Sequence, residues 1–118
     1  MSTITVTNIK ATGETASRAV SGVAAAWARF NGTLTAVINN STGISSLTDN
    51  GTGNYELAVT NSFSSTGVSA TGAQFDDGGG EVPTRAETSS VIIFQFFSAS
   101  NALADGANLS STAHGDLA

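Results

Sequence analysis

The amino-acid sequence predicts an all-β protein, a small antiparallel β-sandwich or barrel of jelly-roll-like type. Three observations lead to this prediction: apolar and polar residues alternate over short runs, turn-forming clusters separate the runs, and no long segment has a helical period. The chain has 118 residues, which is enough for one domain. We expect that domain to span residues 1–118, with an N-terminal strand and connector at 1–22 and the sandwich body at 23–118.

The first predicted strands lie between residues 3 and 30. Residues 3–9 alternate Thr with Ile4 and Val6, which predicts a strand. Residues 10–22 are small and polar, so we expect a loop or a short turn of helix there. Residues 23–30 contain three consecutive alanines, which favour a helix. We nevertheless expect a strand, because the segment is only eight residues long between Gly22 and Asn31-Gly32.

The middle of the chain has the clearest turn and strand signals. Asn31-Gly32 predicts a tight hairpin, since both turn positions tolerate a positive φ. Residues 54–60 form the clearest half-buried strand, with Tyr55, Leu57 and Val59 on one face. The other elements expected here are a strand at 33–38 with Leu34, Ala36 and Ile38 on one face, a turn at 39–43, a strand at 44–48 and a hairpin loop at 49–53.

The C-terminal half is less regular. Residues 63–75 resemble one interrupted strand, and residues 76–89, with three adjacent glycines and the only proline, predict a flexible loop. Residues 90–99 are the most apolar segment, with large side chains on both faces of the predicted strand. We expect one face of this strand in the protomer core and the other against a neighbouring copy. A last strand is expected around residues 109–113.

Large apolar side chains are few, so we expect them to be concentrated in one core and one subunit interface. The predicted core residues are Trp27, Phe30, Tyr55, Leu57 and Val59. If exposed, Trp27, Phe30 and Tyr55 would instead form a platform on which sugar rings stack. The interface of a homotrimer, the simplest closed arrangement around a threefold axis, is predicted to contain Ile4, Val6, Val91, Ile93, Phe94, Phe96 and Phe97.

Charge and composition argue against several classes of protein. Charged residues make up 11% of the chain, against about 25% in a typical domain, and the net charge is −5. The four basic residues are scattered, which argues against binding to nucleic acid or to anionic lipid. There is no cysteine, no apolar run long enough to cross a bilayer and no signal-peptide pattern. We expect synthesis in a cytoplasm.

No residue pattern predicts catalysis, a cofactor or a metal. His114 is the only histidine, whereas a triad or a zinc site needs further partners. Asp76, Asp77 and Glu81 could gather a cation or act as a carboxylate pair, but a glycine-rich loop holds such groups poorly. The run 49–54 predicts a tight hairpin with Asx-turn bonds rather than a Ca²⁺ loop. We therefore expect a protein that is not an enzyme.

Two runs resemble a known family. The first is Trp27-x-x-Phe30-Asn31-Gly32-Thr33, and the second is Thr48-Asp49-Asn50-Gly51-Thr52-Gly53-Asn54-Tyr55. Together with residues 3–13 and 115–118, they are similar to a β domain of tail-fibre and other virion structural proteins of tailed bacteriophages. Arg29 and the segments around residues 76–85 and 91–97 depart from that family's pattern, and the chain is short for a fibre protein.

The resemblance implies a surface-exposed, usually trimeric component of the virion, of tail-fibre or spike type. Its implied partners are sister copies, other virion proteins of the tail or the major capsid protein, and a host surface glycan. Two alternatives stay open. Because the chain is short, it could be a decoration (cement) protein that stabilises the capsid lattice. It could also be a carbohydrate-binding module, in which Trp27 or Tyr55 would be exposed to glycans.

Overall fold

The protein is an all-β sandwich in the computed structural model, which describes residues 1–9, 12–13, 18–19, 23–75 and 80–118. The described residues form strands and no helix. The strands are β1 (Asn8–Ile9), β2 (Arg18–Ala19), β3 (Ala24–Asn31), β4 (Val37–Thr42), β5 (Ile44–Asp49), β6 (Asn54–Val59), β7 (Ser69–Gln74), β8 (Thr84–Thr88), β9 (Val91–Gln95) and β10 (Leu109–His114).

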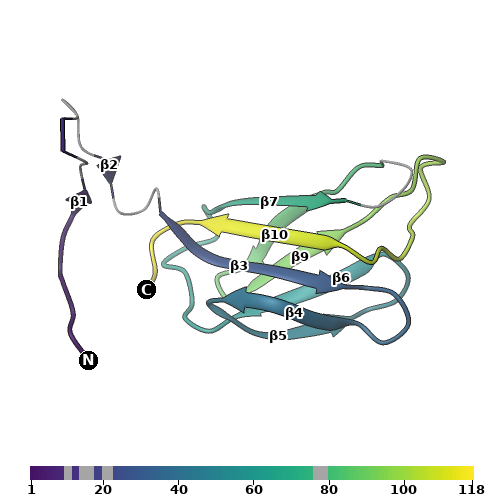
Figure 1. Ribbon diagram of the computed structural model, residues 1–118, viewed down its shortest axis with the longest axis horizontal. Coiled ribbons are helices and arrows are strands. Elements are labelled where there is room, and N and C mark those ends of the chain that lie inside the picture. Colours follow the sequence, from purple (N-terminus) through teal and green to yellow (C-terminus); the bar gives the residue numbers. More distant parts are fainter. Residues whose placement is uncertain (10–11, 14–17, 20–22, 76–79) are drawn as a thin grey trace.

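Eight of these strands make two four-stranded antiparallel sheets that face each other (Figure 1). The front sheet has the order β4-β3-β10-β7, and the back sheet has the order β5-β6-β9-β8. The chain forms hairpins within a sheet at β3–β4, β5–β6 and β8–β9, and crosses between the sheets at the other connections. The predicted sandwich is therefore confirmed. β1 and β2 pair with each other outside both sheets.

Several predicted strands are confirmed with shifts of one or two residues. The alanine-rich segment is the strand β3, although its propensity favours a helix, because each of its even-numbered side chains from Ala26 to Phe30 is buried against the back sheet. β6 shows the expected alternation, with Tyr55, Leu57 and Val59 buried. The strands predicted at 44–48 and around 109–113 are β5 and β10, and the interrupted segment contains β7.

The turn predicted at Asn31-Gly32 is wrong in type. β3 ends at Asn31 and β4 begins only at Val37, so residues 32–36 form a longer loop. The Asn31 side chain accepts hydrogen bonds from the backbone N–H (2.8 Å) and hydroxyl (2.7 Å) of Thr33, which is an Asx turn rather than a two-residue hairpin. The positive φ falls instead on Leu34, at 58°. As a result the turn predicted at 39–43 lies mostly inside β4.

Two other predicted boundaries are corrected. The segment predicted as a loop at 76–89 contains β8, whose Thr and Ala residues pair with β9 and need no large apolar side chains. The N-terminal strand predicted over residues 3–9 is reduced to the two residues of β1. The connector predicted at 10–22 lies largely outside the described residues, apart from 12–13 and β2.

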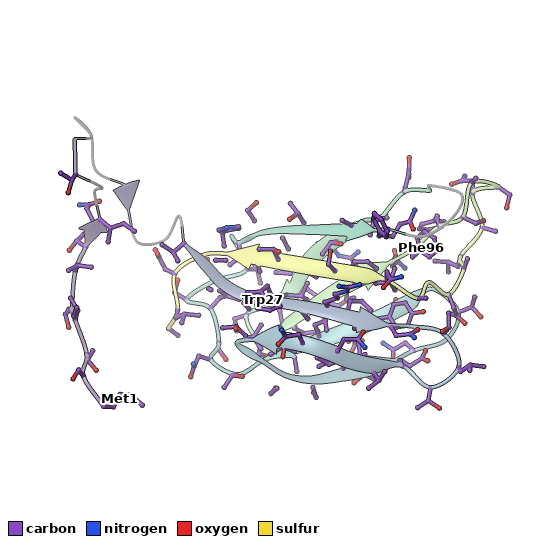
Figure 2. The ribbon with its side chains drawn as sticks, in the orientation of Figure 1. Met1, Trp27 and Phe96 are labelled. Carbon is purple, nitrogen blue, oxygen red and sulfur yellow. The ribbon has the colours of Figure 1, made fainter. Side chains whose placement is uncertain are left out.

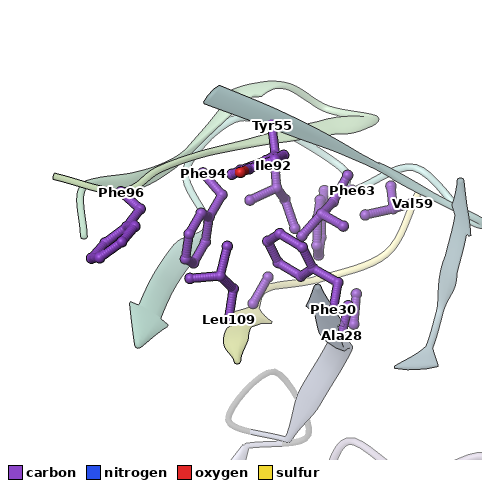
Figure 3. Packing of buried hydrophobic residues seen from close by; sticks show 12 residues of the cluster. Ala28, Phe30, Tyr55, Val59, Phe63, Ile92, Phe94, Phe96 and Leu109 are labelled. Carbon is purple, nitrogen blue, oxygen red and sulfur yellow. The ribbon is translucent and has the colours of Figure 1, made fainter. Parts of the chain in front are cut away.

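The core lies between the sheets and is centred on three aromatic rings (Figure 3). The Phe30 ring meets those of Tyr55 and Phe94 edge-on, with ring centroids 5.4 and 5.1 Å apart. Such edge-to-face pairs add about 0.5–1.5 kcal/mol each beyond the area that they bury. Around them pack Leu57, Val59, Phe63, Ile92, Phe96 and Leu109, with small residues on the front sheet.

Three residues were predicted in the wrong place, all because strand neighbours alternate between faces. Trp27 is not part of the core: it lies three residues from the buried Phe30, so it points to the opposite face of β3. Phe94 and Phe96 were predicted at a subunit interface, but they are 0% and 5% exposed inside the protomer. Because they are enclosed between the sheets, neither can contact a sister copy.

One polar group in the core predicts a stability effect. The hydroxyl of Ser111, on β10, is buried and has no hydrogen-bond partner among the described residues. Because an unpaired buried hydroxyl is unfavourable, we expect Ser111→Ala to raise the free energy of unfolding by about 1 kcal/mol in chemical denaturation. Ser110→Ala, one residue earlier and facing outward, is the matched control and should change it by less than about 0.5 kcal/mol. A loss of stability in Ser111→Ala would contradict the prediction.

Candidate functional site

The runs at residues 27–33 and 48–55 meet at one end of the sandwich. The Tyr55 hydroxyl lies 3.0 Å from the backbone oxygen of Gly32 and 2.8 Å from Oδ1 of Asp105, and it can donate to either. The same Asp105 oxygen accepts the backbone N–H of Gly53 at 2.8 Å. Gly32 in turn donates its N–H to the Gly106 oxygen at 2.8 Å. These bonds tie three loops together, so the two runs have a structural role here.

Both glycines in this cluster allow close approaches. A side chain on Gly32 would overlap the phenol ring of Tyr55. Gly53 has a φ of +65°, and a β-carbon there would lie 2.6 Å from the Phe96 backbone oxygen and 2.7 Å from the backbone of Ala104. In the run Gly53-Asn54-Tyr55, the backbone of Gly53 therefore lies against the β9–β10 connection, and the phenol of Tyr55 enters the core two residues later. This explains why turn chemistry and a large aromatic occur so close together.

The phenol of Tyr55 is strongly perturbed. Burial raises the pKa of Tyr55 well above its usual range. The hydrogen bond to Asp105 and the negative charges of Asp105 and Asp49 raise it further, because each disfavours a phenolate. The protonated phenol is thus the form that the fold requires. Since Tyr55 is fully buried, it cannot stack on a sugar ring.

The outer face of the front sheet carries a different set of residues. Trp27, half-buried, projects from β3 on this face (Figure 2). Arg29, exposed, lies two residues later on the same strand and shares this face. They line a hollow of about 670 Å³, here named the Trp27 hollow. Its polar lining consists of the side chains of Arg29, Asn31, Asn39, Asn40 and Asn108 together with Trp27. A volume of 300–1,000 Å³ is typical of small-molecule sites.

A second hollow adjoins the first. This Phe75 hollow, of about 470 Å³, is lined by Phe75, Ser110, Gln74 and neighbouring residues, and shares Arg29 and Asn108 with the Trp27 hollow. The guanidinium of Arg29 donates a hydrogen bond to Oδ1 of Asn108 at 2.8 Å, at the junction of the two hollows. Phe75 is 88% exposed, which is unusual for an aromatic side chain.

The outer face of the back sheet is more apolar. Val91 and Ile93 on β9 are half-buried and face away from the core, in register with Ala58 and Glu56 of β6. Arg85 of β8 lies opposite Ile93 on the other side. Of the residues predicted at a subunit interface, these two lie on an outer face, and Phe97 is half-buried beyond the end of β9. Their predicted contact with a sister copy stays a prediction.

The N-terminal residues 1–9, here named the N-terminal arm, are exposed throughout and lie beside the sandwich (Figure 1). Ile4 is 85% exposed, Val6 47% and Ile9 41%. Together with Met1, four apolar side chains in nine residues are therefore exposed rather than packed in the described part of the sandwich.

The titratable candidates do not converge on a site within the described residues. Asp76 and Asp77 lie outside those residues, Glu81 is exposed, and His114 is half-buried on β10. Asp49 accepts the Gly51 backbone N–H at 2.9 Å, which is the expected Asx turn. The described residues include no group of three or more His, Cys, Asp or Glu side chains that could hold a metal ion. They also contain no helix long and apolar enough to cross a membrane.

Comparison of the chain with protein-family models, with curated proteins and with solved structures found no match.

Sequence reasoning missed the residues that surround Trp27. Arg29 lies two residues after Trp27, which places both side chains on one face of a strand. That spacing was a usable signal. Asn108 and Asp105 could not be found in the same way, because they reach their partners on β3 and β6 through long-range folding of the β9–β10 connection.

The Tyr55 environment predicts a dependence of stability on alkaline pH. The folded-state pKa of Tyr55 lies above its unfolded value of about 10, so its contribution is fully present below pH 10 and is lost as pH rises through the folded-state pKa. We expect the free energy of unfolding contributed by this group to fall above about pH 10. Denaturant titration at successive pH values measures it, and phenolate absorbance of the only tyrosine reports its ionisation.

Tyr55→Phe is the control for this prediction. It should lower stability at neutral pH by about 1–3 kcal/mol, because it removes a buried hydroxyl that is paired with the Gly32 oxygen and with Asp105, and it should remove the part of the alkaline loss due to Tyr55. An unchanged alkaline profile in Tyr55→Phe, or phenolate formation near pH 10 in the folded protein, would contradict the assignment.

Proposed function

We propose that the protein is a non-enzymatic structural component of a tailed-bacteriophage virion, a surface-exposed trimer of tail-fibre or spike type. The observation that carries this proposal is the N-terminal arm, an alternating run of Thr with Ile4 and Val6 that its own sandwich does not cover. Such a segment is suited to bind another protein. The resemblance of two runs to virion domains supplies the class of partner.

The arm has the chemistry of strand addition. Residues 1–7 belong to no strand, so their backbone N–H and C=O groups are available to pair with a sheet edge of another protein. In an extended segment Ile4 and Val6 lie on one face, where they can enter the partner's core. Burying each of them would contribute about 1.5–3 kcal/mol. The arm thus attaches the sandwich to the adjoining virion protein.

Trimer formation is assigned to the outer face of the back sheet. Ala58, Val91 and Ile93 form an apolar centre on this face, between Glu56 and Arg85. Around a threefold axis these residues of each copy would be covered by the next. A capsid-decoration role uses the same two surfaces, with the major capsid protein as the partner of the arm. The location of the protein on intact particles distinguishes the two roles: density confined to the tail supports a fibre or spike, and density over the head supports decoration.

If the N-terminal arm attaches the protein to the virion, a double variant of its apolar residues should lose that attachment. Ile4→Ser with Val6→Ser should prevent incorporation into particles, measured by the amount of the protein in purified virions, and should leave the thermal unfolding midpoint unchanged. Leu34→Ser is the matched control, because Leu34 is 99% exposed on a loop of the sandwich and the chemical change is the same. Normal incorporation of the double variant would refute the role of the arm.

The apolar outer face of the back sheet leads to a prediction about the number of subunits. We expect a native mass three times the chain mass of 11.8 kDa in sedimentation, and a monomer for Ile93→Lys, since a charge in an apolar interface is unfavourable. Thr71→Lys, an exposed position on the front sheet, should remain a trimer. A wild-type monomer at micromolar concentration would overturn the trimer.

A further inference from the structure

We propose that the outer face of the front sheet binds an acidic oligosaccharide, with Trp27 under one sugar ring and Arg29 on a sugar carboxylate. This inference does not depend on the virion assignment, because it uses neither the N-terminal arm nor the back sheet. It starts from the Trp27 hollow and the adjoining Phe75 hollow, which share Arg29 and Asn108.

The hollows are rich in hydrogen-bond donors. The guanidinium of Arg29 has five N–H groups, of which one binds Asn108. The side-chain oxygen of Asn31 accepts two hydrogen bonds from Thr33, and that of Asn40 accepts one from the backbone N–H of Ser41 at 2.9 Å, while the NH₂ groups of both residues are donors. The indole N–H of Trp27 can only donate. A matching ligand must therefore be rich in acceptors.

The charge of the hollows favours an anion. Neither hollow has a carboxylate among its described lining residues, although the chain as a whole carries a net charge of −5. Among the described lining residues, Arg29 is thus a positive centre with no carboxylate beside it. A planar guanidinium binds a carboxylate through two parallel hydrogen bonds.

The aromatic residues favour a sugar over a simple anion. Trp27 is a half-exposed aromatic ring on the outer face of the front sheet, and Phe75 is an exposed ring in the adjoining hollow, which shares Arg29. Pyranose rings have an apolar C–H face that stacks on such rings and hydroxyls that serve as acceptors for the asparagine amides. Two adjoining hollows of about 670 and 470 Å³ accommodate more than one sugar residue. Together these features select a carboxylated oligosaccharide.

The only tryptophan of the chain lies in the site, so its fluorescence reports binding directly. The probes are trigalacturonate, oligoalginate and sialyllactose, with the methyl ester of trigalacturonate as the neutral match and inorganic phosphate as the anion without a ring. We expect at least one acidic probe to change Trp27 emission with saturation, and its neutral match to bind about tenfold more weakly.

Matched variants locate the site. Arg29→Gln should weaken binding of the acidic probe about tenfold, whereas Arg85→Gln, the same change on the outer face of the back sheet, should not. Trp27→Ala, followed by calorimetry, should abolish binding while the thermal midpoint stays close to wild type. The variant Ile4→Ser with Val6→Ser should bind normally, so the failure of one proposal leaves the other testable.

Four results would overturn the proposal: no response to any acidic probe at millimolar concentration, equal binding of the ester, equal binding of phosphate, or equal effects of Arg29→Gln and Arg85→Gln. A Trp27 emission that responds only to protein concentration would instead make this face a contact between copies of the chain, and would also overturn it.

Discussion

The structure depends most on the position of one hydroxyl group, that of Tyr55. Its ring forms part of the core beside Phe30 and Phe94, and its oxygen reaches the backbone of Gly32 and the carboxylate of Asp105. A thin core cannot by itself fix three loops that are far apart in the sequence, because apolar contact has no direction. A buried phenol does so, since an unpaired partner would be unfavourable. The turn residues around Tyr55 therefore help to position a side chain of the core.

Because side chains alternate along a strand, each strand contributes some residues to the core and others to the outer face of its sheet. On β3 the inward residues Ala26, Ala28 and Phe30 hold the sandwich together, while Trp27 and Arg29 face solvent. On β9 Ile92 and Phe94 are inward, and Val91 and Ile93 are outward. The few large side chains are thus shared between the core and the outer faces of the sheets. The core consequently contains several alanines and buries little apolar area, so its stability tolerates few substitutions.

The sequence was sufficient for the class of fold and for most strands, because alternation and turn clusters are local signals. It was insufficient where a local signal conflicts with pairing. The Asn31-Gly32 pair has the composition of a tight turn, yet Asn31 bonds to Thr33 and the loop runs to residue 36. β8 has no apolar run and is a strand only because β9 pairs with it. Part of the candidate site on the front sheet was predictable, because Trp27 and Arg29 are two residues apart on one strand and share a face. Asn108 was not, because it lies on a loop that is distant in the sequence.

This division also separates the constrained side chains of residues 27–33 and 48–55 from those that are free to vary. The residues of the two runs that meet at Tyr55 are held by buried hydrogen bonds and close backbone approaches, so few substitutions are compatible with the fold. Arg29 lies inside the first run but outside that constraint, because its side chain is exposed on the other face of the strand. A change at Arg29 alters the charge of the front sheet without moving Ala28 or Phe30. A substitution at Arg29 can therefore change the charge of this outer face at little expense to stability.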